Sequence, residues 1–174
     1  MFLCTGNAAR SVMATVITRS RSDLFELSGA GTHAIENCPM GNYTRKALAS
    51  IGLEDRTHRS RQLNPYSADE VDLIIAMAND HVQYVRRNMA EVAHKTVTFK
   101  RLIQDLGEVK AIENASLREA LKSRIAEMSL AEVQLESWEE IGDPGAGDQP
   151  IFMSSLEEID ALVDSFLALF ATYR

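Results

Sequence analysis

Short apolar segments alternate with amphipathic segments along this chain. Residues 1–3 are apolar and lead into Cys4, residues 71–77 are almost continuously apolar, and residues 95–99 alternate between apolar and polar side chains. A continuous apolar run of this kind is typical of a strand that is buried on both faces of a parallel sheet. We therefore predict strands at these places and a further short strand over residues 25–29.

Apolar residues recur at helical spacing between the predicted strands and after the last of them. The C-terminal segment carries an apolar stripe, and Ser154 and Ser155 each precede a glutamate by three residues, which predicts a capping box at the start of that helix. The predicted helices cover residues 12–17, 43–51, 82–89, 102–106, 116–135 and 154–170.

The alternation of strands and helices predicts an α/β fold of three layers, in which helices cover both faces of a parallel sheet. Ligands bind such folds beyond the carboxyl ends of the strands. Cys4 stands at such an end, so the segment that follows it is the first candidate for a binding site.

The composition predicts a single globular domain over residues 1–174, because 45% of the residues are hydrophobic and no segment is repeated. Cys4 and Cys38 are too few for a disulfide framework and no signal-peptide pattern precedes them, so we expect a cytoplasmic protein. The apolar runs are shorter than the roughly 18 residues of a membrane helix. We expect no membrane partner, and the net charge of −7 disfavours nucleic acid as a partner.

The segment Cys4–Ser11 places a thiol and a guanidinium on one short loop, with Arg10 six residues after Cys4. The N–H groups of a loop that wraps into a helix N-terminus converge and carry partial positive charge. They can therefore bind phosphate oxygens and favour a thiolate over a thiol. Arg10 can grip two phosphate oxygens, and the Ser11 hydroxyl can hydrogen-bond the sulfur. This pattern predicts a phosphate-binding loop.

Two residues inside the loop are expected to shape its backbone. Gly6 permits the unusual conformation that wrapping demands, and Asn7 tolerates a left-handed conformation and can lock the loop with its side-chain amide. Taken alone, the pattern also fits a buried structural cysteine beside a solvated arginine. Far downstream, Asp143-Pro144 lies in a glycine-rich loop, which by itself is typical of a turn.

The segment Cys4–Ser11 closely resembles the N-terminal signature Cys-x-Gly-Asn-x-Cys-Arg-Ser of the low-molecular-weight protein tyrosine phosphatases. The resemblance covers nearly the whole chain, and it implies the fold of that family, a four-stranded parallel sheet flanked by helices. The further landmarks, in family order, are residues 29–32, Pro39-Met40, residues 58–63, residues 72–74 and Asp143-Pro144.

The resemblance implies a phosphomonoester hydrolase, a protein tyrosine phosphatase that acts through a phosphocysteine intermediate without a metal or other cofactor. Cys4 would be the nucleophile, Arg10 the phosphate clamp and Ser11 the group that stabilises the thiolate. Asp143 would protonate the leaving oxygen and later activate water. The implied partners are a phosphorylated protein or a small phosphomonoester, and oxyanions such as phosphate and vanadate.

The remaining residues of the loop would contribute phosphate binding, and His58 would join Asn7 in a supporting hydrogen-bond network. The other histidines, His33, His81 and His94, lack the spacing of metal ligands, and we assign them no role. The loop residues assigned to phosphate binding are Thr5, Gly6, Asn7, Ala8 and Ala9.

The chain departs from the family at several positions. Ala9 replaces the second cysteine of the signature, and Gly29 stands where a serine is common. Ile35 stands at the position of the first substrate-stacking aromatic residue, and Gly145 and Ala146 replace the aromatic residues after Asp-Pro. We therefore expect both aromatic walls of the substrate cleft to be missing.

Three other functions remain open. An arsenate reductase on the same fold needs further thiols, and only Cys38 is present, so it would depend on an external small thiol. A phosphoarginine phosphatase is compatible with the loop, and the missing aromatic walls disfavour phenolic substrates. A catalytically idle phosphate-binding module is the alternative of another class.

Overall fold

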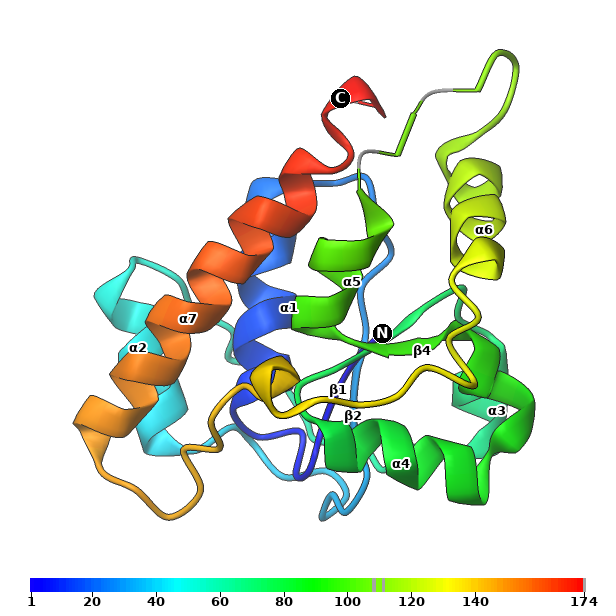
Figure 1. Cartoon of the computed structure of the whole chain (residues 1–174). Helices are drawn as coiled ribbons and strands as arrows, with labels where there is room; N and C mark the ends of the chain where they lie inside the picture. The colour runs from blue at the N-terminus through cyan, green and yellow to red at the C-terminus, as the bar shows by residue number, and fades with distance from the viewer. Residues whose placement is uncertain (108, 111, 174) are drawn as a thin grey trace.

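Four short parallel strands form the sheet at the centre of the molecule (Figure 1). The computed structural model describes residues 1–107, 109–110 and 112–173. The strands lie in the order β2-β1-β3-β4, which confirms the predicted four-stranded parallel sheet. Their bounds are β1 (Phe2–Cys4), β2 (Gly29–Gly31), β3 (Ile74–Ala76) and β4 (Thr96–Thr98).

Both faces of the sheet are buried because side chains alternate along each strand. Phe2 and Ile75 point into one apolar core, and Leu3 and Ile74 point into the other. This explains why the strand segments read as continuous apolar runs rather than as alternating patterns.

Helices cover each face and give the predicted three layers (Figure 1). The first core is covered by α1 (Arg10–Arg21), α5 (Phe99–Leu106) and α7 (Gln149–Ala168), and α2 (Asn42–Ser50) packs against α7. The second core is covered by α3 (Pro65–Asp69), α4 (Asn79–Asn88) and the 3-10 helix η1 (Ala90–Lys95). The remaining elements are α6 (Leu117–Glu127), which packs against η1, and the 3-10 helices η2 (Ser137–Glu139) and η3 (Ala171–Tyr173).

Two predicted strands were placed or bounded wrongly. The strand expected at residues 25–29 is β2, which begins only at Gly29 and has the sequence Gly-Ala-Gly, without the β-branched or aromatic residues that indicate a strand. The apolar run at residues 71–77 contains β3, but only Ile74–Ala76 pair as a strand. Tertiary pairing with β1 therefore sets these bounds more than local apolarity does.

The two longest predicted helices also have different bounds in the structure. Helix α6 ends at Glu127 rather than near residue 135, because Ser129 adopts a left-handed conformation with a φ of 49°. Helix α7 begins at Gln149, five residues before the expected capping box, with Pro150 in its first turn. The fixed φ of proline suits that position, so the proline starts the helix where the serines were expected to do so.

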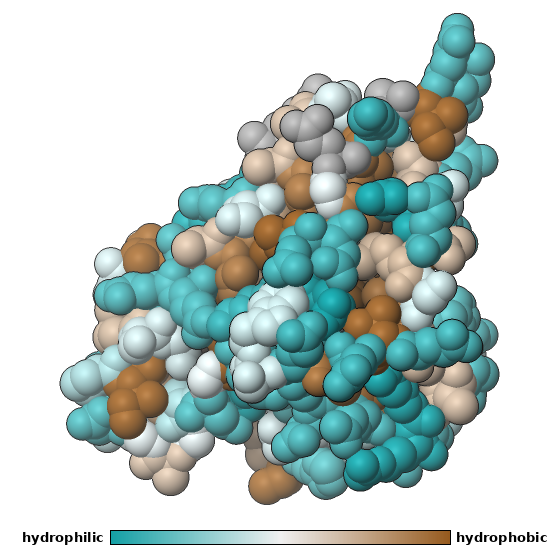
Figure 2. Space-filling view, viewed as in Figure 1, coloured by the Kyte–Doolittle hydropathy of each residue, from teal (hydrophilic) through white to brown (hydrophobic). Residues whose placement is uncertain are grey.

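Figure 2 shows that hydrophobic residues occur on the visible face in small separate groups among hydrophilic ones. In the described part of the chain, no helix is both long enough and apolar enough to cross a membrane.

Candidate active site

The loop that joins β1 to α1 carries the predicted site. Cys4 is the last residue of β1 and is buried, and Arg10 is the first residue of α1. Asn7 takes the left-handed conformation, with a φ of 49°. Gly6 does not, and the one contact of a β-carbon there with the described residues beyond its chain neighbours would be Ala8, at 3.9 Å. The conformational role expected of Gly6 was therefore wrong.

A hydrogen-bond chain runs from Asn7 through Ser11 to the sulfur of Cys4. The Asn7 amide nitrogen donates to Ser11 Oγ at 2.9 Å, and Ser11 Oγ lies 3.0 Å from Cys4 Sγ. Because the amide nitrogen can only donate, the hydroxyl hydrogen of Ser11 is free to point at the sulfur. This arrangement suits a cysteine that works as a thiolate.

Asn7 is itself fixed by the segment that carries His58. His58 Nε2 donates to the main-chain oxygen of Asn7 at 2.8 Å, and the Arg61 N–H donates to Asn7 Oδ1 at 3.0 Å. Burial lowers the pKa of His58 below its ordinary value, against the effect of this hydrogen bond. A neutral imidazole at neutral pH carries the single N–H that the contact needs.

Arg10 and Asp143 meet although they lie near opposite ends of the chain. Arg10 Nη2 is 2.6 Å from Asp143 Oδ2, and Arg10 Nη1 donates to the main-chain oxygen of Ile141 at 3.0 Å. The Arg10 side chain is 4% exposed, whereas that of Asp143 is 54% exposed. The guanidinium is therefore held in the wall of the site, and the carboxylate stands at its mouth.

A buried carboxylate, which no sequence pattern indicated, holds the segment that carries Asp143. Glu139 is fully buried, pairs with Arg101 Nη2 at 2.6 Å and accepts a hydrogen bond from Thr98 at the end of β4. Next to it, the Ile141 N–H donates to the oxygen of Met77 at 3.0 Å. These contacts fasten the segment before Asp143 to the carboxyl ends of β3 and β4.

The mouth of the site lacks aromatic side chains at the family's stacking positions. Ile35 is 77% exposed, and Gly145 and Ala146 are exposed. The Gly145 N–H donates to Asp143 Oδ1 at 2.9 Å, and Gly145 adopts a left-handed φ of 47°. The glycine thus closes a tight turn around the carboxylate.

His81, which was assigned no role from the sequence, lies at the site. Its Nε2 is 3.0 Å from Thr5 Oγ1, and the residue is 3% exposed. Burial and the positive charge of Arg10 lower its pKa to about 4, against the opposing effects of Asp143 and Asp80. The spacing of metal ligands in the sequence does not indicate this contact, because the partner of His81 is a threonine hydroxyl.

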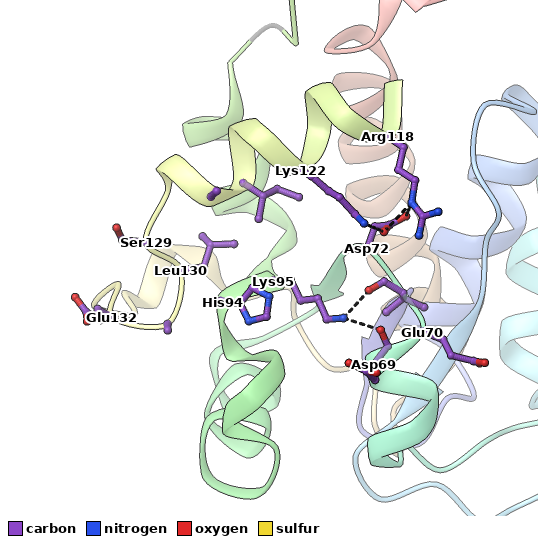
Figure 3. Close-up of a pocket in the computed structure, with 14 residues that line it drawn as sticks. Asp69, Glu70, Asp72, His94, Lys95, Arg118, Lys122, Ser129, Leu130 and Glu132 are labelled. Carbon is purple, nitrogen blue, oxygen red and sulfur yellow. Dashed lines mark hydrogen bonds and ion pairs between the residues drawn. The ribbon is translucent and has the colours of Figure 1, made fainter. Parts of the chain in front are cut away.

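A cavity of about 640 Å³ opens at the opposite edge of the sheet, between α6 and the segments before β3 and β4 (Figure 3). The lysine and arginine side chains that line it are paired with nearby residues. Lys95 donates to the main-chain oxygens of Asp69 and Val71, and Arg118 and Lys122 pair with Asp72. The two ion pairs with Asp72 fasten α6 to the segment before β3, and we assign the cavity no chemistry.

Comparisons with known proteins agree with the geometry. Residues 1–114 match the family described as low molecular weight phosphotyrosine protein phosphatase. The low molecular weight protein-tyrosine-phosphatase Etp of Escherichia coli K12 is 29% identical over 104 residues, which are 60% of this chain and 70% of that protein. The protein-arginine-phosphatase of Geobacillus stearothermophilus is 30% identical over 104 residues, which are 59% of this chain and 70% of that protein.

Solved structures of similar fold cover almost the whole chain. The YwlE arginine phosphatase from Geobacillus stearothermophilus superposes with a TM-score of 0.75 at 22% identity, over 99% of this chain and 92% of that one. The tyrosine phosphatase Wzb from Escherichia coli K30, in complex with sulphate, gives 0.72 at 18% identity, over 98% and 96%. At these sequence identities the superpositions establish the fold. The match of residues 1–114 to the family establishes family membership. The chain belongs to the low molecular weight phosphotyrosine protein phosphatase family of cysteine-dependent hydrolases.

Proposed function

We propose that this protein hydrolyses phosphomonoesters, with phosphotyrosine in proteins as the first candidate substrate, through a phosphocysteine formed on Cys4. The observation that carries the proposal is the meeting of Arg10 and Asp143 beside the Cys4 loop, with 2.6 Å between Nη2 and Oδ2. A cation for the phosphoryl oxygens and a carboxyl group for the leaving oxygen are the groups that such a reaction requires.

The proposed reaction has two steps. The Cys4 thiolate attacks phosphorus, the bond between phosphorus and the leaving oxygen breaks, and that oxygen takes a proton from Asp143. Water then attacks the phosphocysteine, gives its proton to Asp143, and releases inorganic phosphate and the thiolate. Ser11 donates a hydrogen bond to the thiolate before the first step and again after the second. Arg10 stays bound to the equatorial oxygens of the phosphoryl group during its transfer.

Arg10 changes partner in this scheme. In the free protein it pairs with Asp143 and with the Ile141 oxygen. A bound phosphoryl group offers a stronger partner to the guanidinium, so Asp143 leaves the ion pair. Its carboxylate can then take up from solvent the proton that it gives to the leaving oxygen. The main-chain N–H groups of residues 5–9 supply the remaining donors.

We also propose that residues 1–174 work as one catalytic domain. Helix α7 contributes Ile159, Val163 and Phe166 to the core that holds β1, and Asp143 comes from the loop before it. A reducing cytoplasm suits this mechanism, because the thiol of Cys4 has to remain unoxidised.

Phosphoarginine is a second candidate substrate. It is favoured by the absence of aromatic walls at Ile35, Gly145 and Ala146, since a guanidinium leaving group needs no phenyl-stacking surface. The relative named protein-arginine-phosphatase, at 30% identity, adds support. Paired peptides that differ only in carrying phosphotyrosine or phosphoarginine separate the two substrates by their kcat/KM values.

Leaving-group dependence tests the role of Asp143. We expect Asp143→Asn to slow hydrolysis of phenyl phosphate by about 10²–10⁴-fold and that of para-nitrophenyl phosphate much less, because the better leaving group needs little protonation. Asp148→Asn, in the same loop, is the matched control and should behave like the parent protein. Equal losses on both substrates would remove Asp143 from the role of general acid.

A further inference from the structure

A buried histidine and an exposed threonine lie in contact on one side of the phosphate loop. His81 belongs to the first turn of α4, which follows the carboxyl end of β3, and Thr5 follows Cys4. His81 Nε2 is 3.0 Å from Thr5 Oγ1, and Arg10 Nη2 is 3.4 Å from the same oxygen. Thr5 thus links the imidazole to the phosphate clamp.

The position of the imidazole hydrogen follows from these contacts. Among the described residues, none hydrogen-bonds His81 Nδ1, which is buried. A hydrogen on Nδ1 would be a buried donor without a partner, which proteins avoid more strictly than an unused acceptor. The neutral imidazole therefore carries its hydrogen on Nε2 and donates it to Thr5 Oγ1.

Thr5 Oγ1 then receives two hydrogen bonds. Arg10 can only donate, and His81 Nε2 donates as well, so both lone pairs of the oxygen are used. Among the residues that the structure describes, none accepts the hydroxyl hydrogen of Thr5, whose side chain is exposed beside Cys4. It is available to an acceptor on a bound molecule.

We propose that Thr5 donates this hydrogen to a phosphoryl oxygen of the substrate, and that His81 is the positioning residue that sets the orientation of the hydroxyl. The inference rests on the proposed function and adds to it a side-chain donor for the phosphoryl group. A hydrogen bond to a charged oxygen strengthens binding by about ten- to a hundredfold.

Binding of inorganic phosphate to the purified full chain, measured by calorimetry, tests the proposal without depending on turnover. Thr5→Val removes the hydroxyl and His81→Leu removes the donor, and each should weaken phosphate binding about tenfold. Thr5→Ser and His81→Gln keep the respective groups and should stay within about twofold of the parent. The double variant Thr5→Val with His81→Leu should bind no more weakly than Thr5→Val alone.

Controls separate positioning from folding. His94→Leu removes an exposed histidine at the far edge of the sheet and should leave phosphate binding unchanged. His81→Asn, whose amide is too short to reach Thr5, repeats the test if His81→Leu does not fold. Unchanged phosphate binding in Thr5→Val, or losses that multiply in the double variant, would overturn the proposal.

Failure of the Thr5–His81 proposal can be distinguished from failure of the proposed function. Turnover by Cys4→Ser would overturn the phosphocysteine mechanism while leaving the phosphate measurement intact. The Thr5 and His81 variants should raise KM for para-nitrophenyl phosphate and leave kcat within about threefold, because the hydrogen bond is made in the ground state and in the transition state alike.

Discussion

Gly31 in β2 lies directly against the main-chain oxygen of Thr5: a β-carbon on Gly31 would sit 2.5 Å from that oxygen. It would also lie 2.9 Å from the Asn7 nitrogen. The strand and the phosphate loop can approach this closely only because residue 31 has no side chain.

Gly31→Ala should therefore destabilise the protein and distort the loop together. Overpacking of this kind costs about 1–3 kcal/mol, and here the two nearest atoms belong to the backbone and cannot rotate away as a side chain could. Chemical denaturation should show the loss, and the dissociation constant for vanadate should rise. Gly142→Ala is the control, since no described residue other than its two chain neighbours places an atom within 4 Å of a β-carbon there. Equal stability of the two variants would show that Gly31 is not tightly packed against the loop.

Glu139→Ala should destabilise the fold by roughly 3 kcal/mol, because it leaves Arg101 without its buried partner. The variant should also lose activity, since the pair fastens the segment that carries Asp143. Glu54→Ala removes the exposed partner of Arg56 and should change the free energy of unfolding by less than about 1 kcal/mol. Comparable denaturation curves for the two variants would refute a structural role for Glu139.

Stability should fall as the pH drops below 6.5, the ordinary pKa of histidine, toward the lowered pKa of His81, about 4. Between these two pKa values the imidazole is protonated in the unfolded chain and neutral in the folded protein, so lowering the pH favours unfolding. The contribution of His81 is on the order of 3 kcal/mol, and His58, whose pKa is also lowered, acts in the same direction. The free energy of unfolding, measured between pH 6.5 and pH 4, should depend less on pH in His81→Gln than in the parent protein. The same pH dependence in both proteins would mean that His81 is not held neutral.

Aromatic side chains introduced at the mouth of the site should raise the activity toward phosphotyrosine substrates. Ile35→Tyr combined with Ala146→Tyr should raise kcat/KM for a phosphotyrosine peptide by about tenfold, since stacking contributes roughly 0.5–1.5 kcal/mol per wall. Gly145 is unsuitable for this test because its left-handed φ of 47° would strain a tyrosine. Ile112→Tyr adds an exposed aromatic residue outside the loops of the site and should have no effect; no gain in the double variant would show that these positions do not form the walls.

The sequence was most informative where local pattern and chemistry coincide. The segment Cys4–Ser11 combines an apolar strand, a turn and a helix start with a thiol and a guanidinium, so its fold and chemistry could be predicted together. The association of His58 with the loop was available only through the family resemblance, and the structure places His58 on the Asn7 oxygen.

Features that depend on packing could not be predicted. The position of β2 is set by the close approach of Gly31 to Thr5, which leaves no trace in local hydrophobicity. Glu139 looks like any surface glutamate in the sequence, and only the fold brings Arg101 and Thr98 to it. His81 is a third case, because its partner is 76 residues away.

Covalent labelling of acid-quenched enzyme tests whether Cys4 carries the phosphoryl group between the two steps. After rapid mixing with radiolabelled phosphopeptide, we expect a burst of label on the enzyme that approaches one phosphoryl group per chain and maps to the peptide containing Cys4. Cys4→Ala should show no label. Turnover without a labelled intermediate, or label on any other residue, would overturn the phosphocysteine mechanism.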